Sequence, residues 1–274
     1  MQVERLIAVI ILATAGASAR AETVDCTPVT SLPATIGAQG IYCLTGNLAT
    51  SQTSGSAITI GANNVTLDLN GWKVGGQAAG TSTQVIGIYS GANNVTIKNG
   101  IVRGFSRGIQ LTGRGATVQG VTADQNTTYG IVVTGQGSVV QGNQVVDTGG
   151  STQAANVNAI GIFAGGSGSL VQNNLVSGLT ATGSSSEYGI YFDSTASQST
   201  ARGNVVSDAA RPSVGPSFGV LMLGTSAVAV SNNIVTNFTL CVDYADGATG
   251  TYSRNTAIGC DTSYYSGTTG SGND

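Results

Sequence analysis

The sequence contains no histidine. This absence excludes a Ser-His-Asp triad, a Cys-His pair and any zinc site built on imidazole. Charged residues are also scarce, at 8% of 274 residues, with ten Lys and Arg against thirteen Asp and Glu. A protein that binds nucleic acid needs a basic stripe, and a net charge of −3 on so few side chains does not provide one. We therefore expect no nucleic-acid partner.

Long apolar runs are missing too. No stretch approaches the ~18 residues that a transmembrane helix requires. At the N-terminus, Arg5 precedes the short apolar run Leu6–Ala15, and either Ala17-Ser18-Ala19 or Ala19-Arg20-Ala21 then offers small residues for cleavage. This order of basic, apolar and small residues is typical of a secretory signal peptide, which we expect over residues 1–21. We expect export to the periplasm or the extracellular space without a membrane span, and the oligomeric state stays open.

Cysteine is rare but regularly placed. Cys26 and Cys43 lie near one end of the chain, and Cys241 and Cys260 lie near the other. In an exported protein, local pairs of this kind indicate disulfides. No CxxC spacing occurs, and we expect neither a metal site nor a cofactor.

Glycine, in contrast, is abundant and marks a repeat. The hexapeptide Gly61–Thr66 recurs unchanged as Gly91–Thr96. A Gly-Ile or Gly-Val step then recurs at intervals of 21 or 22 residues, or at longer intervals that contain insertions. Fixed periods of this length are the signature of solenoid proteins.

Alignment on the Gly-Ile steps produces aliphatic columns. The first is Ile88, Ile109, Ile131, Ile162, Ile190, Val220 and Val242. The second is Ile97, Val118, Val140, Val171, Ala201, Val230 and Tyr252, and the third is Val102, Thr122, Val145, Val176, Val206 and Val235. Short stretches of alternating apolar and polar residues around them predict three strands per coil.

These features predict an all-β fold, a parallel β-solenoid of about eight coils. We expect an N-terminal cap over residues 22–56, the solenoid over 57–260 and a flexible tail over 261–274. The second cysteine pair would staple the last coil.

A polar column runs beside the aliphatic ones: Asn143, Asn174, Asn204, Asn233 and Asn255. Stacked amides can hydrogen-bond from coil to coil, so we interpret this column as a structural asparagine ladder. A row of ligand-binding amides is the alternative.

Two phrases connect this repeat to a known family. They are Asn64-Val65-Thr66-Leu67-Asp68-Leu69-Asn70-Gly71 and Asn94-Val95-Thr96-Ile97-Lys98-Asn99-Gly100. With the Gly-Ile steps that follow, the chain resembles right-handed parallel β-helix proteins of the pectin-lyase-like superfamily over residues 57–260. The resemblance implies a right-handed β-helix. Enzymes of this superfamily commonly act on acidic polysaccharides, but the scaffold also carries adhesins and other functions.

The insertions all fall just before a Gly-Ile step. They cover residues 75–84, 148–158, 179–187 and 209–217. Loops stacked on one edge of a solenoid commonly build a binding surface. The coils that begin at Gly87 and Gly108 have no insertion, so they should form the floor of a trough between the first two loops.

Polar and aromatic residues gather at this floor: Lys73, Arg103, Phe105, Arg107, Asp124, Asn126 and Tyr129. Arginine binds carboxylates in a bidentate manner, so Arg103 and Arg107 could neutralise a uronate. Tyr129 or Lys73 could then act as acid or base. We expect Lys73, Phe105 and Asn126 to contact the substrate. The alternative is that the arginines are ordinary solvated surface charges.

Two carboxylates suggest a second chemistry. Our alignment places Asp124 and Asp147 in one column on adjacent coils, about 5 Å apart. Paired carboxylates at such a separation suit glycoside hydrolysis. Capping of local turns is the alternative role for this column, which also contains Asp208.

Aromatic residues directly precede several Gly-Ile steps, at Tyr129, Tyr188 and Phe218. Facing solvent, they would form a platform for sugar rings, and facing inward they would fill the core. We expect core filling for Phe218 and leave Tyr129 open.

The sequence thus predicts an exported β-helix protein with a polysaccharide partner. As an enzyme it would be a lyase or epimerase of uronate-containing polysaccharides, with glycoside hydrolysis as a second option. The alternative is a non-catalytic solenoid that binds glycans, acts as an adhesin or has a structural role in the cell envelope.

Overall fold

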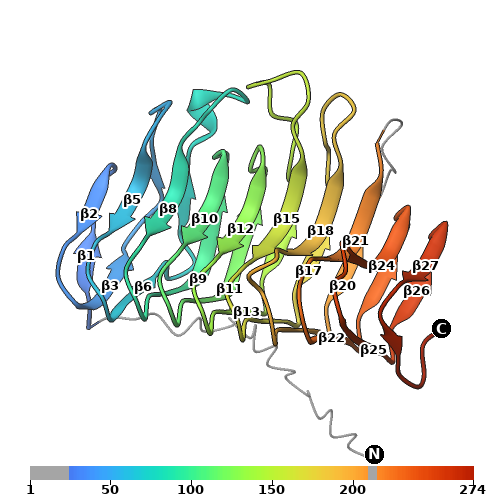
Figure 1. The fold of residues 1–274 in the computed structure, drawn as a ribbon. Coiled ribbons are helices and arrows are strands. Elements are labelled where there is room, and N and C mark those ends of the chain that lie inside the picture. Colours follow the sequence, from blue (N-terminus) through green and yellow to red (C-terminus); the bar gives the residue numbers. More distant parts are fainter. Residues whose placement is uncertain (1–24, 209–214) are drawn as a thin grey trace, which may run out of the picture.

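The computed structural model describes residues 25–208 and 215–274 as a solenoid of parallel strands (Figure 1). The predicted signal peptide, residues 1–21, lies outside the described residues. So does the segment 209–214 of the fourth predicted insertion. No helix of the described part is long and apolar enough to cross a membrane.

One face of the solenoid is a ten-stranded parallel sheet, here called sheet B, to which each coil contributes one strand. Its strands are β2 (Ala34–Ile36), β5 (Ser56–Ile60), β8 (Ile86–Ser90), β10 (Arg107–Leu111), β12 (Tyr129–Val133), β15 (Ala159–Ala164), β18 (Glu187–Phe192), β21 (Ser217–Leu223), β24 (Leu240–Ala245) and β27 (Thr262–Tyr265).

The remaining strands form an eighteen-stranded sheet, sheet A, with two rows that meet at a corner. The first row is β1 (Thr27–Val29), β3 (Gly40–Leu44), β6 (Val65–Asp68), β9 (Thr96–Arg103), β11 (Thr117–Asp124), β13 (Val139–Gln141), β16 (Leu170–Gln172), β19 (Thr200–Arg202), β22 (Val228–Ser231), β25 (Gly250–Ser253) and β28 (Thr268–Thr269). The second row is β4 (Leu48–Ala49), β7 (Lys73–Gly75), β14 (Gln144–Val146), β17 (Leu175–Ser177), β20 (Val205–Ser207), β23 (Ile234–Thr236) and β26 (Thr256–Ile258). Strands β9 and β11 run through the corner and belong to both rows.

The coil number exceeds the expected value of about eight, because the ten strands of sheet B represent ten coils in the described residues. The difference comes from the two ends. Within the expected cap, 22–56, β2 pairs in register with β5, so this segment forms the first coil. Within the expected tail, 261–274, β27 and β28 extend both sheets by one strand each.

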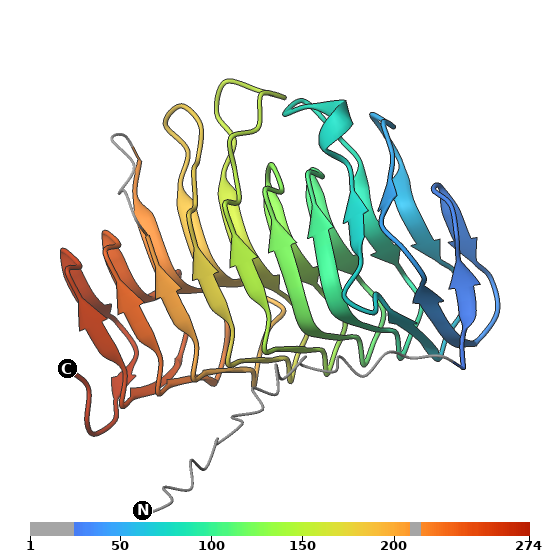
Figure 2. The same ribbon diagram turned by 180° about the vertical axis from the view of Figure 1, so that it is seen from behind.

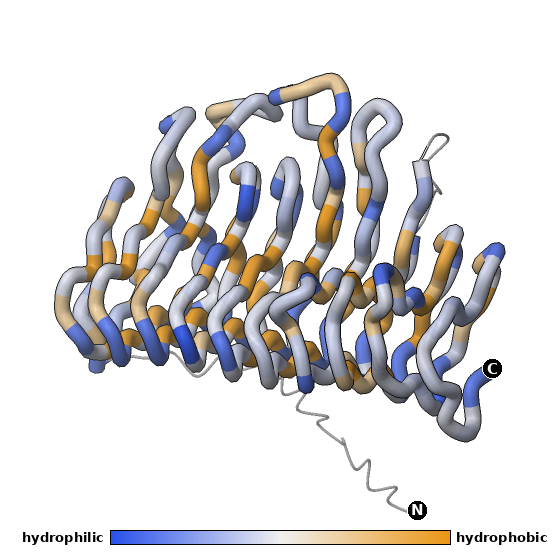
Figure 3. Tube along the Cα trace, viewed as in Figure 1, coloured by the Kyte–Doolittle hydropathy of each residue, from blue (hydrophilic) through white to orange (hydrophobic). Residues whose placement is uncertain are grey.

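The core consists of the inward-facing aliphatic columns. The first two columns are in the predicted register, as in the pairs Ile109↔Ile131 and Val118↔Val140. Hydrophobic and hydrophilic positions alternate along the strands, as expected for a sheet with one buried face (Figure 3). The third column needs one correction, because Ala123 and not Thr122 pairs with Val145.

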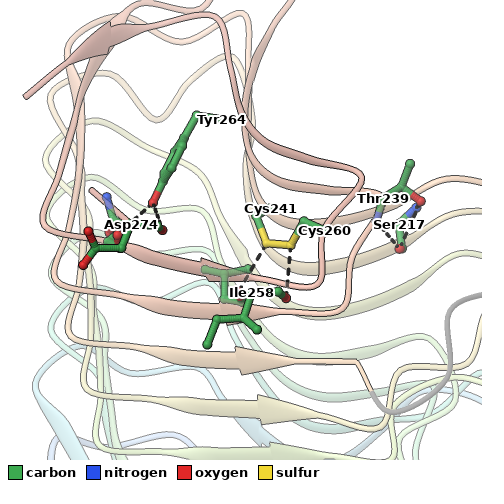
Figure 4. Close-up of a disulfide and its surroundings, with 9 residues drawn as sticks. Ser217, Thr239, Cys241, Ile258, Cys260, Tyr264 and Asp274 are labelled. Atoms are coloured by element: carbon green, nitrogen blue, oxygen red, sulfur yellow. Dashed lines mark hydrogen bonds between the residues drawn. A yellow bond between two sulfur atoms is a disulfide. The ribbon is translucent and has the colours of Figure 1, made fainter. Parts of the chain in front are cut away.

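Disulfides close both ends of the described chain. Cys26 pairs with Cys43 in the first coil, and Cys241 pairs with Cys260 beside the last one (Figure 4). Both pairings are the predicted ones.

The five ladder asparagines stack at the corner of sheet A and are almost fully buried. In each step, the side-chain oxygen of one asparagine accepts from the backbone N–H and the side-chain amide of the asparagine one coil before it. The amide group of Asn204 also donates to the carbonyl of Val171, at 3.0 Å. A buried amide that satisfies three backbone or side-chain groups at every corner has a structural role.

A positive-φ residue directly precedes each ladder asparagine, for example Gly142 and Asn173. Glycine and asparagine tolerate this left-handed conformation, which lets the chain bend sharply between the two rows.

Candidate functional site

The two predicted walls of the trough meet each other. Loop 75–84 contains the short 3-10 helix η1 (Gln77–Ala79) and reaches loop 148–158 above the shorter turns before β10 and β12 (Figure 1 and Figure 2). The N–H of Thr152 donates to the carbonyl of Thr81 at 3.1 Å, and their hydroxyls are also 3.1 Å apart. The Gln153 amide donates to the Thr83 carbonyl. The loops therefore form an arch over the expected open trough.

A cavity of about 310 Å³ lies under the arch. Its lining is polar and small: Gln77, Gly80, Thr81, Gly104, Gln125, Thr127, Asp147 and Gly149. Asp147 is the one expected catalytic residue that reaches it.

Two of the expected substrate contacts are buried. Phe105 lies in the hydrophobic core with no exposed surface. Asn126 is equally buried, and its side chain accepts from the Phe105 N–H at 3.1 Å and donates to the Val102 carbonyl at 3.2 Å. Phe105 thus fills the core beneath the arch and Asn126 satisfies the backbone of the same turn. Neither side chain is accessible to a substrate, which corrects the expectation.

Arg103 and Asp124 are register partners on β9 and β11 of sheet A. The guanidinium Nε lies 3.1 Å from Asp124 Oδ2, and Nη2 donates to Gln125 Oε1 at 2.6 Å. Arg103 is therefore engaged by neighbours on its own sheet. Lys73, on β7, also belongs to sheet A and pairs in register with Ile101.

The predicted pairing of Asp124 with Asp147 is off by one residue. Asp124 pairs with Val146, and the residue aligned with Asp147 is Gln125. Gln125 and Asp147 both have positive φ, at 51° and 52°, and share the turn that ends the second row. Asp124 is ion-paired with Arg103, whereas Asp147 lines the cavity under the arch, so the two carboxylates do not form the register pair that the hydrolase hypothesis requires.

Arg107 and Tyr129 do come together, on the outer face of sheet B. They are register partners on β10 and β12, and the guanidinium carbon lies 5.2 Å from the centre of the tyrosine ring. Arg107 Nη1 also donates to Gln110 Oε1 at 2.7 Å. Arg107 and Tyr129 line a cavity of about 180 Å³ together with Val132 and Phe163. The five expected catalytic residues are thus divided between two sheets.

The same face of sheet B carries a continuous series of rings, here called the aromatic strip: Tyr129, Phe163, Tyr188, Tyr191 and Phe218. All five are partly exposed. Ring centres are 6.1 Å apart for Tyr129 and Phe163, and 5.1 Å apart for Phe163 and Tyr191. Tyr188 stacks on Tyr191 and on Phe218, each at 5.2 Å. The strip crosses four consecutive coils, from β12 to β21.

The ring planes are not all parallel. Phe163 is nearly perpendicular to both Tyr129 and Tyr191, at 81° and 85°, whereas Tyr188 and Phe218 are within 6° of parallel. Among the described residues, none forms a hydrogen bond with the hydroxyl of Tyr129, Tyr188 or Tyr191. The strip is therefore an apolar surface that includes three tyrosine hydroxyls without partners among the described residues.

Sequence reasoning missed Phe163 and Tyr191 and placed Phe218 in the core. Phe218 lies in an outward column with Tyr188, because its position directly precedes the glycine of the Gly-Val step. Phe163 and Tyr191 each follow the isoleucine of the step and face outward with Val132 and Leu221. Extending the column alignment by one residue would have found them.

Two carboxyl groups near sheet B are buried. Burial and the neighbouring Asp208 raise the pKa of Glu187 to about 8, although its Oε1 accepts from the Ala181 N–H at 2.9 Å. Burial, followed by the charge of Asp246, raises the pKa of Asp243 to about 6. Both groups therefore retain a proton more strongly than solvated carboxyls do.

Within residues 25–208 and 215–274, no group of three or more His, Cys, Asp or Glu side chains is placed to hold a metal ion.

Comparison with known proteins agrees with this architecture. A search of curated sequences found no match. Among solved structures, the Dettilon tailspike protein is similar at a TM-score of 0.64 and 15% identity, over 91% of this chain and 58% of that chain. The enzymatically active domain of tailspike protein 2 of bacteriophage CBA120 is similar at a TM-score of 0.51 and 12% identity, over 85% and 38%. This chain thus spans less than two thirds of either tailspike chain.

The family model of the right handed beta helix region matches residues 87–262, from the glycine of β8 to the first residue of β27. The chain therefore belongs to the right-handed β-helix family.

Proposed function

We propose that this protein binds polysaccharide along the aromatic strip of sheet B. The observation that carries the proposal is the continuity of five partly exposed rings over four coils. Aromatic rings with free hydroxyls offer both the apolar surface and the polar contacts that sugar rings require. A polymer lying along the solenoid axis would meet one or two rings per coil.

Arg107 directs the proposal toward acidic polysaccharides. Its guanidinium borders the strip at Tyr129 and retains free N–H groups beyond the one that Gln110 accepts. Arginine is suited to carboxylates because its donors match their two oxygens. The resemblance to pectin-lyase-like proteins supports a uronate-containing ligand.

We propose binding without cleavage. The lyase hypothesis needs Arg103 and Arg107 on one uronate, but they lie on different sheets and Arg103 is paired with Asp124. The hydrolase hypothesis needs Asp124 and Asp147 as a register pair, but Asp124 pairs with Val146 and is bound to Arg103.

We also propose that the protein is exported. Two disulfides join all four cysteines of the chain, which suits an oxidising compartment. The basic and apolar pattern of residues 1–21 supports the same proposal.

Isothermal titration calorimetry with oligomers of polygalacturonate and alginate tests the proposal. We expect saturable binding, weakened at least tenfold in Phe163→Ala, which removes the ring at the centre of the strip. Gln172→Ala, an outward residue of sheet A, is the matched control and should bind like the wild type. Equal binding by Phe163→Ala and the wild type, or no binding to either polymer, would contradict the proposal.

Mass spectrometry of the same incubations tests the second part. Intact oligomers are expected. Fragments that lack an added water would establish a lyase, and fragments that carry it would establish a hydrolase.

A further inference from the structure

The asparagine ladder does not extend over the whole corner of sheet A. The ladder begins, in chain order, at Asn143, whose side-chain oxygen accepts from the Val121 N–H at 2.9 Å. In the three coils before it, the corner position is occupied by Val121, Gly100 and Trp72. Strands β9 and β11 run straight through this part of the corner, whereas the ladder coils break there into two short strands.

A cleft of about 440 Å³ opens where the ladder is missing. It is lined by Asn70, Gly71, Asn99, Gly100, Ile101, Gly120 and Thr122. This volume lies within the range of small-molecule sites and accommodates a sugar residue.

One wall of the cleft results from a local insertion. From Thr66 to Lys73 the chain advances seven positions, while the paired segment Thr96 to Ile101 advances five. The two extra residues cannot follow the strand, and Asn70 and Gly71 turn with φ values of 47° and 78°. The resulting bulge packs on β9 because Gly100 has no side chain, since a Cβ there would lie 2.3 Å from the Cβ of Leu69.

The chemistry of the cleft is polar and neutral. The nearest ion pair is neutral, since Lys98 Nζ lies 2.9 Å from Asp68 Oδ2. The Lys73 side chain, beside the lining residue Ile101, extends toward Gly75, which does not line the cleft. Asn99 donates to the same carboxylate through its amide nitrogen, which leaves its amide oxygen to accept from a ligand. The Thr122 hydroxyl forms no hydrogen bond with another described residue. Trp72, directly after Gly71, is 36% exposed.

We propose that this corner cleft is a second carbohydrate site, which binds a neutral pyranose residue. The lining carries amide and hydroxyl groups and no charged residue, which favours neutral hydroxyl-rich ligands over carboxylates. The partly exposed indole of Trp72 directly follows the lining residue Gly71 and is placed to report a bound sugar. The site lies on sheet A and does not depend on the aromatic strip of sheet B.

The sequence offers a specific reporter, because Trp72 is its only tryptophan. Tryptophan emission is recorded during titration of the mature protein with mannohexaose, cellohexaose and maltohexaose. We expect a saturable change with at least one of the three. No saturable change with any of them would overturn the proposal.

Two variants of Thr122 locate the effect. Thr122→Tyr fills the cleft and should raise the sugar concentration at the titration midpoint at least tenfold. Thr122→Ala, which shortens the side chain and removes its hydroxyl, should raise this concentration about threefold. The control is Gln144→Tyr, because Gln144 is the register partner of Thr122 one coil further on, beside the ladder. It should leave the midpoint unchanged. Wild-type midpoints in both Thr122 variants would overturn the proposal.

The proposed binding at the aromatic strip and the proposed binding in the corner cleft can be tested independently. Phe163→Ala should leave the Trp72 titration unaltered, and Thr122→Tyr should leave the binding of acidic oligomers unaltered. A Trp72 signal lost in Phe163→Ala would mean that the neutral sugar binds at the strip, which contradicts a site in the corner cleft.

Discussion

The outer faces of the two sheets differ although they are built on the same coils. On sheet A, outward side chains satisfy one another: Gln141 donates to Gln119 at 3.0 Å, Gln172 donates to Gln141 at 2.8 Å, and Arg202 donates to Gln172 at 2.9 Å. On sheet B, the equivalent outward positions carry rings whose hydroxyls have no described partner. Outward positions are not required to fill the core, so their side chains are free to differ between the two sheets.

Taken with the proposed function, the comparison divides the molecule into a sheet A whose outward side chains bond to one another outside the corner cleft and a sheet B whose rings are offered to a ligand. Four substitutions test this division, and their expected effects decrease from the first to the last.

Replacement of a central ladder residue should have the largest effect. Asn204→Ala removes the acceptor of the Asn174 N–H and amide and the donor to the Val171 carbonyl. Buried polar groups left without partners should lower the free energy of unfolding by about 3 kcal/mol. Urea denaturation measures this change. Polysaccharide binding per folded molecule should be unchanged, and a loss of less than 0.5 kcal/mol (about the effect of an ordinary surface substitution) would show that the ladder is dispensable.

The second effect depends on pH. The pKa of Glu187 is about 8 in the folded chain against 4.5 for the unperturbed group. Between these values the unfolded chain releases a proton that the folded chain retains, so stability falls as the pH rises from 4.5 to 8. Glu187→Gln, which stays neutral, should be more stable than the wild type at pH 8 by about 2 kcal/mol.

The variant and the wild type should be equally stable at pH 4, where Glu187 is protonated in both the folded and the unfolded chain. Asp243 adds a decline of the same sign up to about pH 6 in both proteins. Thermal unfolding at pH 4, 6 and 8 measures these differences. Parallel stability curves for the variant and the wild type would rule out Glu187 as the source.

Loss of the positive charge beside the aromatic strip should have a smaller effect. Arg107→Gln removes the guanidinium over Tyr129 and should weaken binding of polygalacturonate oligomers about fivefold, or ~1 kcal/mol. The salt dependence of binding should decrease with it. Calorimetry at two salt concentrations measures both, with Arg202→Gln on sheet A as the control. An equal loss in both variants would mean that only the net charge matters.

The smallest effect is expected for the glutamine chain of sheet A. Gln141→Ala breaks an exposed hydrogen bond with Gln119 and a part-buried one with Gln172, and should lower stability by about 0.5 kcal/mol without affecting binding. A clear loss of polysaccharide affinity in this variant would contradict the division between the sheets.

Much of the fold could be predicted because each coil repeats the same order of aliphatic, polar and turn residues. The columns that contain Ile109 and Val118 followed from periodicity, and the two disulfides followed from local cysteine pairs. The candidate site was less predictable, since Asp124 and Asp147 differ by one position in a turn and Phe105 looks like any exposed loop aromatic in the sequence. Such details depend on register, and a single residue reverses the face of a side chain.

By itself, the sequence determined the repeat, the strand columns, the corner asparagines and the closure of both ends. These features depend on alternation and spacing along the chain. Only the tertiary structure decided that loops 75–84 and 148–158 join, that Arg103 and Arg107 belong to different sheets, and that five rings form one strip. Each of these depends on contacts between coils about 20 to 70 residues apart, which the stacking of the solenoid brings together.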